Sequence, residues 1–130
     1  MKQASGTFDV ALALLPIENA TDADLMQRRS IHKTFHGALD GTSKGQMLSI
    51  GTGTTGSAVY VAVERVEARL DGKSGTFALH HTGIMNRGAP TLTIAVVPDS
   101  GTDALTGITG TMQIDIRDKQ HYYTFDYDIP

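Results

Sequence analysis

The stretch that decides the fold is SAVYVAVERVEARL-DG-KSGTFALHHTGIM, residues 57–85. Apolar and polar side chains alternate on both sides of Asp71-Gly72, and this dipeptide is a strong two-residue hairpin signal. The stretch therefore predicts two antiparallel strands joined at residues 71–72. Counting outward from the turn gives the cross-strand pairs Leu70–Lys73, Val66–Phe77, Glu64–Leu79 and Ala62–His81.

Successive side chains of a strand point to opposite faces, so this register divides the hairpin into two sides. One side carries the aromatic and large aliphatic residues, and we assign it to the interior: Tyr60, Ala62, Glu64, Val66, Phe77, Leu79, His81, Gly83 and Met85. The same counting from a turn at Asp118-Lys119 gives a second interior face, which carries Met112, Ile114, Ile116, His121, Tyr123, Phe125 and Tyr127.

Similar alternation and turn signals continue on both sides of this hairpin. We expect further strands over residues 4–15, 29–39, 42–51, 92–98, 105–116 and 121–129, with Asp40-Gly41 as another hairpin turn. Residues 17–28 are the exception, and Thr21 or Asp22 is expected to cap one short helical turn carrying Leu25 and Met26.

This pattern predicts an all-β fold with residues 1–130 forming a single domain. Eight antiparallel strands in sequence are most stable when the first pairs with the last, because closure removes both exposed edges. We therefore expect a closed eight-stranded antiparallel meander barrel, similar in kind to a lipocalin, with an open β-sandwich as the alternative. The interior of such a barrel is filled by side chains or holds one small ligand.

Composition excludes several classes of function. The net charge is −3 with no basic run, so we expect no nucleic-acid partner. No apolar stretch approaches the roughly 18 residues of a spanning helix, so we expect no membrane partner and a cytoplasmic location. The chain has no cysteine, and its histidines are badly placed to share an ion, so we expect no metal and no cofactor.

Glu64 and His81 are the polar exceptions on the interior face, and they are diagonal neighbours on adjacent strands. A buried carboxylate beside a histidine suits general acid–base catalysis, so these two are the candidate catalytic residues. A purely structural ion pair is the alternative. The candidate ligand-binding residues are Tyr60, Glu64, Phe77, His81, Met85, Tyr123 and Phe125.

Val59, Val61 and Val63 alternate on the outer face of the same strand. Three exposed β-branched residues in a row indicate a covered surface. We expect a homo-oligomer packed through these valines, with residues 17–28 folding over them as the alternative.

Four segments, at residues 35–48, 60–90, 96–114 and 122–127, together resemble an uncharacterised bacterial family known only as a domain of unknown function. That family resembles the allene oxide cyclase-like barrels. In SGTDALTGITG, Gly101, Thr102, Leu105, Gly107 and Gly110 match the pattern of these barrels, whereas Asp103 replaces a turn glycine. The resemblance implies a closed eight-stranded barrel with an apolar cavity, commonly in an oligomer.

Three functions stay open at this point. The first is binding of a small apolar or amphipathic ligand in the barrel, with residues 17–28 as a lid. The second is an isomerase or cyclase resembling allene oxide cyclase, an activity that rests on analogy alone. The third is a filled barrel that acts as an oligomeric interaction protein. Whether the chain is an enzyme is left undecided.

Overall fold

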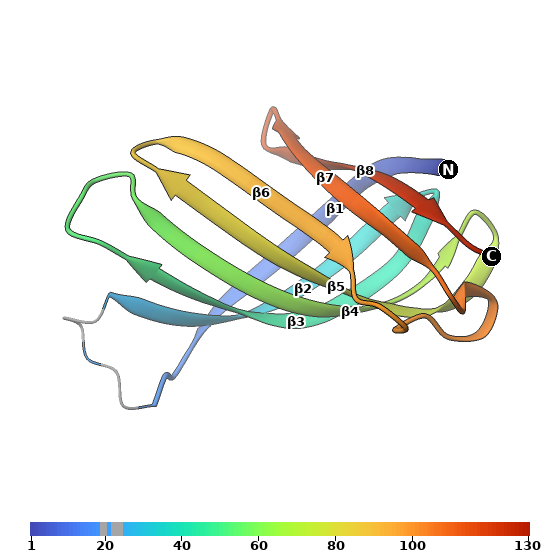
Figure 1. Cartoon of the computed structure of the whole chain (residues 1–130), viewed down its shortest axis with the longest axis horizontal. Helices are drawn as coiled ribbons and strands as arrows, with labels where there is room; N and C mark the ends of the chain where they lie inside the picture. The colour runs from blue at the N-terminus through green and yellow to red at the C-terminus, as the bar shows by residue number, and fades with distance from the viewer. Residues whose placement is uncertain (19–20, 22–24) are drawn as a thin grey trace.

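Eight strands form one closed antiparallel barrel in the computed structural model, which describes residues 1–18, 21 and 25–130 (Figure 1). Each strand pairs with its sequence neighbours, and β1 pairs with β8 to close the ring. The strands are β1 Lys2–Leu15, β2 Met26–Gly37, β3 Leu39–Gly51, β4 Ala58–Leu70, β5 Lys73–Asn86, β6 Ala89–Val96, β7 Thr109–Arg117 and β8 Gln120–Asp128. The predicted closed meander is confirmed, and the open sandwich is excluded.

The hairpin that decided the fold has the predicted register. Glu64 lies opposite Leu79 and Ala62 lies opposite His81, as counting from the Asp71-Gly72 turn required. Both turn residues have positive φ, the geometry that suits a tight two-residue hairpin. The interior face carries most of the core, because the alternation of period two is kept along both strands.

Two predictions around β2 were wrong. The β2–β3 turn lies at Gly37-Ala38, where Gly37 adopts a φ of +106°, and not at Asp40-Gly41. Asp40 and Gly41 instead belong to β3 and pair with β4. In addition, Met26 was expected on a short helical turn but is the first residue of β2, where it pairs with Ile50 of β3. Residues 19, 20 and 22–24, which include the proposed cap Asp22, lie outside the described residues.

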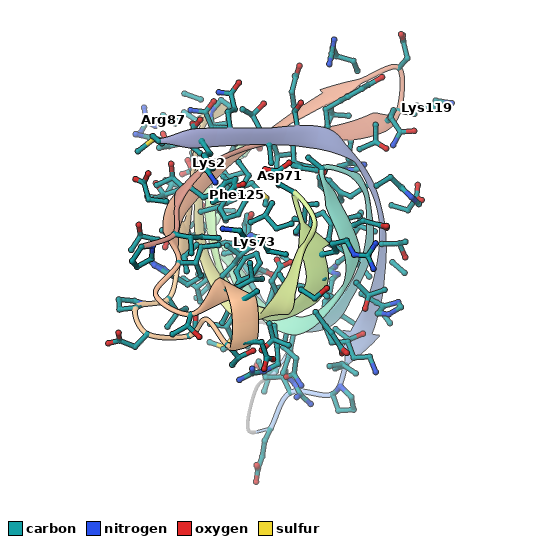
Figure 2. The ribbon with its side chains drawn as sticks, turned by 90° about the vertical axis from the view of Figure 1, so that its right-hand side faces the viewer. Lys2, Asp71, Lys73, Arg87, Lys119 and Phe125 are labelled. Atoms are coloured by element: carbon teal, nitrogen blue, oxygen red, sulfur yellow. The ribbon has the colours of Figure 1, made fainter. Side chains whose placement is uncertain are left out.

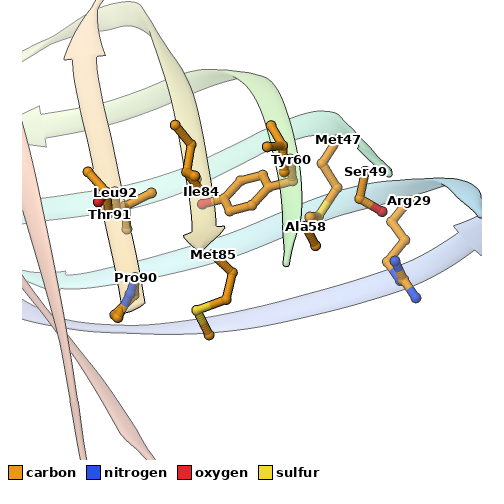
Figure 3. A pocket seen from close by; sticks show the side chains of 12 residues that line it. Arg29, Met47, Ser49, Ala58, Tyr60, Ile84, Met85, Pro90, Thr91 and Leu92 are labelled. Atoms are coloured by element: carbon orange, nitrogen blue, oxygen red, sulfur yellow. The ribbon is translucent and has the colours of Figure 1, made fainter. Parts of the chain in front are cut away.

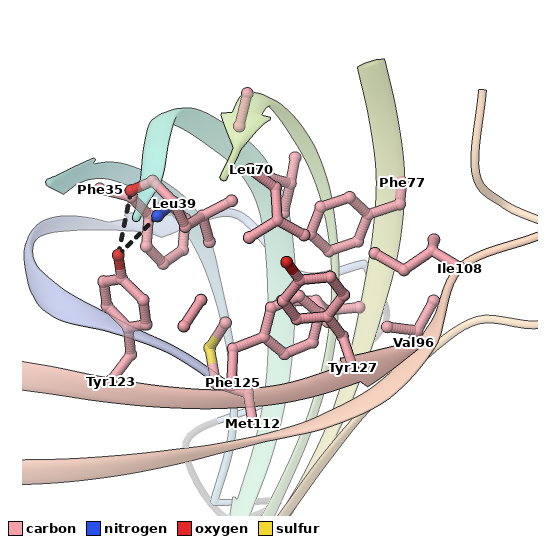
Figure 4. Close-up of a cluster of buried hydrophobic side chains, with 14 of the residues drawn as sticks. Phe35, Leu39, Leu70, Phe77, Val96, Ile108, Met112, Tyr123, Phe125 and Tyr127 are labelled. Carbon is pink, nitrogen blue, oxygen red and sulfur yellow. Dashed lines mark hydrogen bonds between the residues drawn. The ribbon is translucent and has the colours of Figure 1, made fainter. Parts of the chain in front are cut away.

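The barrel has two unlike halves. Seen along its axis in Figure 2, the strands enclose inward-pointing side chains such as Phe125. One half, at the end with the β2–β3 and β4–β5 turns, is packed solid (Figure 4). Its fully buried side chains are Phe35, Leu39, Leu70, Phe77, Leu79, Tyr123, Phe125 and Tyr127. Rings stack there, with the Phe77 and Phe125 centroids 5.7 Å apart, so this half leaves no room for a ligand.

The segment between β6 and β7 seals the packed end. It contains the short 3₁₀ helix η2, Asp103–Leu105, whose Leu105 is completely buried. The Thr102 hydroxyl accepts a hydrogen bond from the backbone N–H of Thr76 on β5, which fixes the segment against the barrel. The glycine-rich motif at residues 100–110 therefore serves closure of the barrel, and its glycines report fold rather than chemistry.

The other half is open. The β3–β4, β5–β6 and β7–β8 turns lie at this end, because turns alternate between the two ends of a meander (Figure 1). Inward-facing apolar side chains remain exposed there: Leu12 is 53%, Met85 41%, Leu92 43% and Ile116 60% exposed. Burying these side chains requires something that enters the barrel or covers its mouth.

Candidate functional site

A buried cluster of three ionisable side chains lies at the boundary between the packed and open halves. The Glu64 carboxylate oxygen Oε2 is 2.9 Å from Nζ of Lys33 and 2.6 Å from Nε2 of His81. The side chain of Glu64 is completely inaccessible, and those of Lys33 and His81 are 6% and 4% exposed. Lys33 donates a hydrogen bond to Glu64. The ring nitrogen Nε2 of His81 lies against the same carboxylate oxygen.

The three residues come from β2, β4 and β5. Glu64 and His81 are diagonal neighbours on adjacent strands, as the sequence register required. Lys33 reaches Glu64 across the intervening strand β3, where the residue opposite Glu64 is Gly45. A Cβ at position 45 would lie 2.8 Å from the Cβ of Glu64, so a larger residue would crowd the carboxylate. Because Gly45 has no side chain, Lys33 and Glu64 can meet across β3.

The electrostatics keep Glu64 ionised. Burial by itself raises the pKa of the carboxyl, but the contact with His81 and the charge of Lys33 outweigh it and lower the pKa to about 2. The second carboxylate oxygen, Oε1, is buried without a hydrogen-bond partner among the described residues. Glu64 is thus a fixed negative charge that balances the basic groups around it.

A cavity of about 270 Å³ lies on the open side of this cluster. Lys33 and His81 line it, together with His121, whereas Glu64 lies behind them. The remaining lining residues are mostly apolar: Phe8, Val10, Leu12, Ile31, Met47, Tyr60, Leu92, Ile114 and Ile116. An apolar chamber with a few polar groups gathered at one place is typical of small-molecule sites.

A second cavity of about 380 Å³ adjoins the first at the mouth and shares Met47, Tyr60 and Leu92 with it (Figure 3). Tyr60 separates the deep part from the mouth, and its ring lies directly over Gly83 of β5. A Cβ at position 83 would meet the Tyr60 ring at 2.0 Å, so only glycine allows this ring position. Burial and the nearby charge of Glu64 raise the pKa of Tyr60, which keeps its hydroxyl protonated as a donor.

Strands β6 and β7 are paired over only a short length, so part of the wall of the deep cavity consists of side chains and not of hydrogen-bonded strands. These strands share only the pairs Ile94–Met112 and Ala95–Thr111 among the described residues. Toward the mouth they diverge (Figure 1), and Leu92 of β6 and Ile114 of β7 line the cavity there. At this level the wall of the cavity is therefore formed by side chains alone.

The structure divides the predicted ligand-binding residues between the two halves. Tyr60 and His81 line the deep cavity, Met85 lines the mouth, and Glu64 supports the floor from behind. Phe77, Tyr123 and Phe125 lie in the packed half and line neither cavity. The Tyr123 hydroxyl has a structural role. It accepts a hydrogen bond from the backbone N–H of Leu39 and donates one to the carbonyl oxygen of His36.

Sequence reasoning missed Lys33 as a member of the site. Its inward direction follows from alternation along β2, since Lys33 lies between Ile31 and Phe35 on one strand face and all three side chains are buried. The contact of Lys33 with Glu64 could not be predicted from the sequence, because β2 and β4 are not adjacent strands. Met47 and Leu92 were also missed, and His121 was assigned to the interior but not to the site. Only the tilt of the strands shows that these residues meet at the same level.

The outer valines lie where they were expected. Val59 is 37%, Val61 47% and Val63 61% exposed on the outer face of β4. Leu48 of β3 pairs with Val61, and Ile84 of β5 pairs with Val59, so the apolar surface extends over three strands. We call Leu48, Ile50, Val59, Val61, Val63 and Ile84 the outer patch.

Two further observations concern other classes of site. Within residues 1–18, 21 and 25–130, no three histidine, aspartate or glutamate side chains gather in a way that would hold a metal ion. The described residues also contain no helix with the length and apolar character needed to cross a membrane.

The fold and the cavities define a class of protein, the closed antiparallel barrels with one packed half and one hollow half. The chain matches the family described as "Protein of unknown function (DUF3224)" over residues 4–127, and it belongs to that family. The uncharacterised family expected from the sequence is thereby confirmed.

A crystal structure of a protein of unknown function from the same family, from Shewanella oneidensis MR-1, is similar to this chain throughout. The two share 41% sequence identity with a TM-score of 0.94, over 100% of this chain and 98% of the other. No curated protein matches the chain at a significant level.

Proposed function

We propose that the barrel binds one small apolar or amphipathic ligand in its open half. The observation that carries this proposal is the pair of adjoining cavities, lined by apolar side chains and floored by the Lys33–Glu64–His81 cluster. The mouth cavity of about 380 Å³ is by itself within the size range of small-molecule sites, and the deep cavity of about 270 Å³ adjoins it. A relation to the allene oxide cyclase-like barrels is part of the same proposal, and the closed barrel with an apolar cavity supports it.

The exposed apolar side chains at the mouth of the barrel also support the proposal. Leu12, Met85 and Leu92 face inward yet stay between 41% and 53% exposed to water. Each such side chain gains about 25 cal/mol per Å² of apolar surface that a ligand covers. Binding is therefore driven by burial of surface that the folded protein leaves exposed.

Titration with Nile red, a neutral apolar dye, tests the proposal. We expect its fluorescence to rise and saturate with one dye molecule per barrel. Leu92→Trp places an indole in the space shared by both cavities and should abolish the signal. Thr93→Trp is the matched control, because Thr93 pairs with Thr82 on the outer face of the same strand.

The outcomes separate cleanly. Loss of binding in Leu92→Trp with retention in Thr93→Trp supports a ligand in the open half. Absence of dye binding in the wild type, or equal binding in both variants, overturns the proposal. Native mass spectrometry of gently purified protein adds an independent measurement, since a retained ligand gives a defined mass increment that a solvent extract then identifies.

A further inference from the structure

The deep cavity has an unusual polar lining, because its polar groups are hydrogen-bond donors or bases. Lys33 contributes an ammonium group, and His81 and His121 contribute imidazoles. Tyr60 contributes a hydroxyl whose pKa is raised by burial and by Glu64. None of the described residues that line this cavity is an aspartate or a glutamate. The lining therefore favours an acceptor over a donor.

Lys33 has donor capacity beyond its ion pair. An ammonium group carries three N–H donors, and Glu64 is the oxygen acceptor found for Lys33 among the described residues. The nitrogen also lies 5.0 Å from the centroid of the Phe8 ring, a cation–π contact that leaves its hydrogens available. An oxygen atom of a ligand in the cavity would satisfy donors that the protein leaves unused.

The charges of the cluster also favour an anion. Glu64 Oε2 contacts both Lys33 and His81, and these two basic groups line the cavity whereas the carboxylate does not. A cationic group in the cavity would lie directly beside the Lys33 ammonium and be repelled, whereas an anionic group would accept hydrogen bonds from it. The unpartnered Oε1 of Glu64 does not reverse this, since Glu64 lies behind Lys33 and His81 and does not line the cavity.

We propose that the ligand carries an acidic oxygen group, a carboxylate or a comparable oxyanion, at one end of an apolar body, and that this group lies against Lys33 and His81. The apolar body then lies along Tyr60 and Leu92 toward the mouth. This inference rests on the proposed ligand-binding function and adds the chemical class of the ligand and its direction in the barrel.

Three probes with the same apolar chain test the inference: decanoate, decan-1-ol and decylamine, each below its micellar concentration and titrated by calorimetry. We expect decanoate to bind roughly tenfold or more tightly than decan-1-ol, because a charge-assisted hydrogen bond replaces a neutral one. Decylamine should bind most weakly. The wild-type series needs no substitution, so the test does not depend on the folding of any variant.

The double variant Lys33→Met/Glu64→Gln assigns the preference to the cluster. It removes both members of the pair and so avoids leaving one charge buried alone. We expect the affinities for decanoate and decan-1-ol to become equal within about twofold, with decan-1-ol binding unchanged. Lys44→Met is the matched control, because Lys44 projects from the outer face of β3 opposite Arg65, and it should keep the preference for decanoate.

Three results overturn the inference: decan-1-ol binding as tightly as decanoate, decylamine binding most tightly, or a decanoate preference that survives in the double variant. In each of these cases Nile red binding still supports a ligand site in the open half. If Nile red, decanoate and decan-1-ol all fail to bind, the proposed function itself is overturned, and this inference falls with it.

Discussion

Lys33 of β2 and Glu64 of β4 form a buried ion pair across the strand that separates them, with 2.9 Å between Nζ and Oε2. Both side chains are almost completely shielded from water. Such a pair stabilises a protein only weakly compared with well-packed apolar residues, because desolvation of both charges offsets their attraction. In the ligand-binding function that we propose, the pair has a second use, because it presents a paired but still hydrogen-bond-competent ammonium group at the floor of an open cavity.

The pair makes the barrel sensitive to acid. The pKa of Glu64 is about 2 in the folded protein against an ordinary value of 4.5, so ionised Glu64 stabilises the folded state above that ordinary value. This contribution is lost as the pH falls from 4.5 toward 2, and we expect it to be on the order of 3 kcal/mol. Urea unfolding followed by circular dichroism across this pH range measures it. Lys33→Met/Glu64→Gln should show a clearly smaller slope, and an equal slope in both proteins contradicts the assignment.

The contact between Tyr60 and Gly83 predicts a specific steric conflict. Gly83→Ala puts a methyl group into the Tyr60 ring, so we expect a loss of about 1 to 3 kcal/mol in the free energy of unfolding and weaker Nile red binding. Tyr60→Ala should relieve the conflict, so that the second substitution costs less in the Gly83→Ala background than alone. A double-mutant cycle measures this coupling. If the two changes in the free energy of unfolding are additive, the position of the Tyr60 ring does not depend on Gly83.

The two halves of the barrel should respond differently to the same substitution. Leu105→Ala empties a completely buried position at the packed end, and we expect it to cost about 2 to 5 kcal/mol of stability. Nile red affinity should stay unchanged. Leu92→Ala at the mouth should do the reverse, changing stability by less than about 1 kcal/mol while weakening dye binding. Thermal unfolding and dye titration on both variants check this division, which fails if Leu105→Ala weakens the dye as much as Leu92→Ala.

The outer patch supports a proposal of self-association. Exposed apolar rows on three neighbouring strands form a surface that two copies can bury against each other through a twofold axis. We expect light scattering to give an oligomer mass for the wild type and a lower mass for Val61→Asp. Gln113→Asp, on the exposed face of β7, should leave the mass unchanged. A monomeric wild type, or a Val61→Asp protein of unchanged mass, contradicts the proposal.

Several parts of this protein were predictable from short-range patterns. The Asp71-Gly72 turn determines which residues of β4 and β5 face each other, because a two-residue turn leaves no freedom of register. Period-two alternation then assigns Glu64 and His81 to the interior as diagonal neighbours, and their contact follows. The β2–β3 turn was not predictable in this way, since Asp40-Gly41 has the composition of a turn but pairs within β3.

By itself, the sequence determined the eight strands, their order and the face on which each side chain of the central hairpin lies. These properties depend on alternation and on turns, which act between neighbours in the chain. Only the tertiary structure decided which residues share one level of the barrel. Phe77 and Tyr60 lie on the same inner surface, yet one is packed solid and the other borders a cavity. Strand tilt and closure set that difference, and they also bring Lys33 to Glu64 across β3, a contact between strands that are not adjacent.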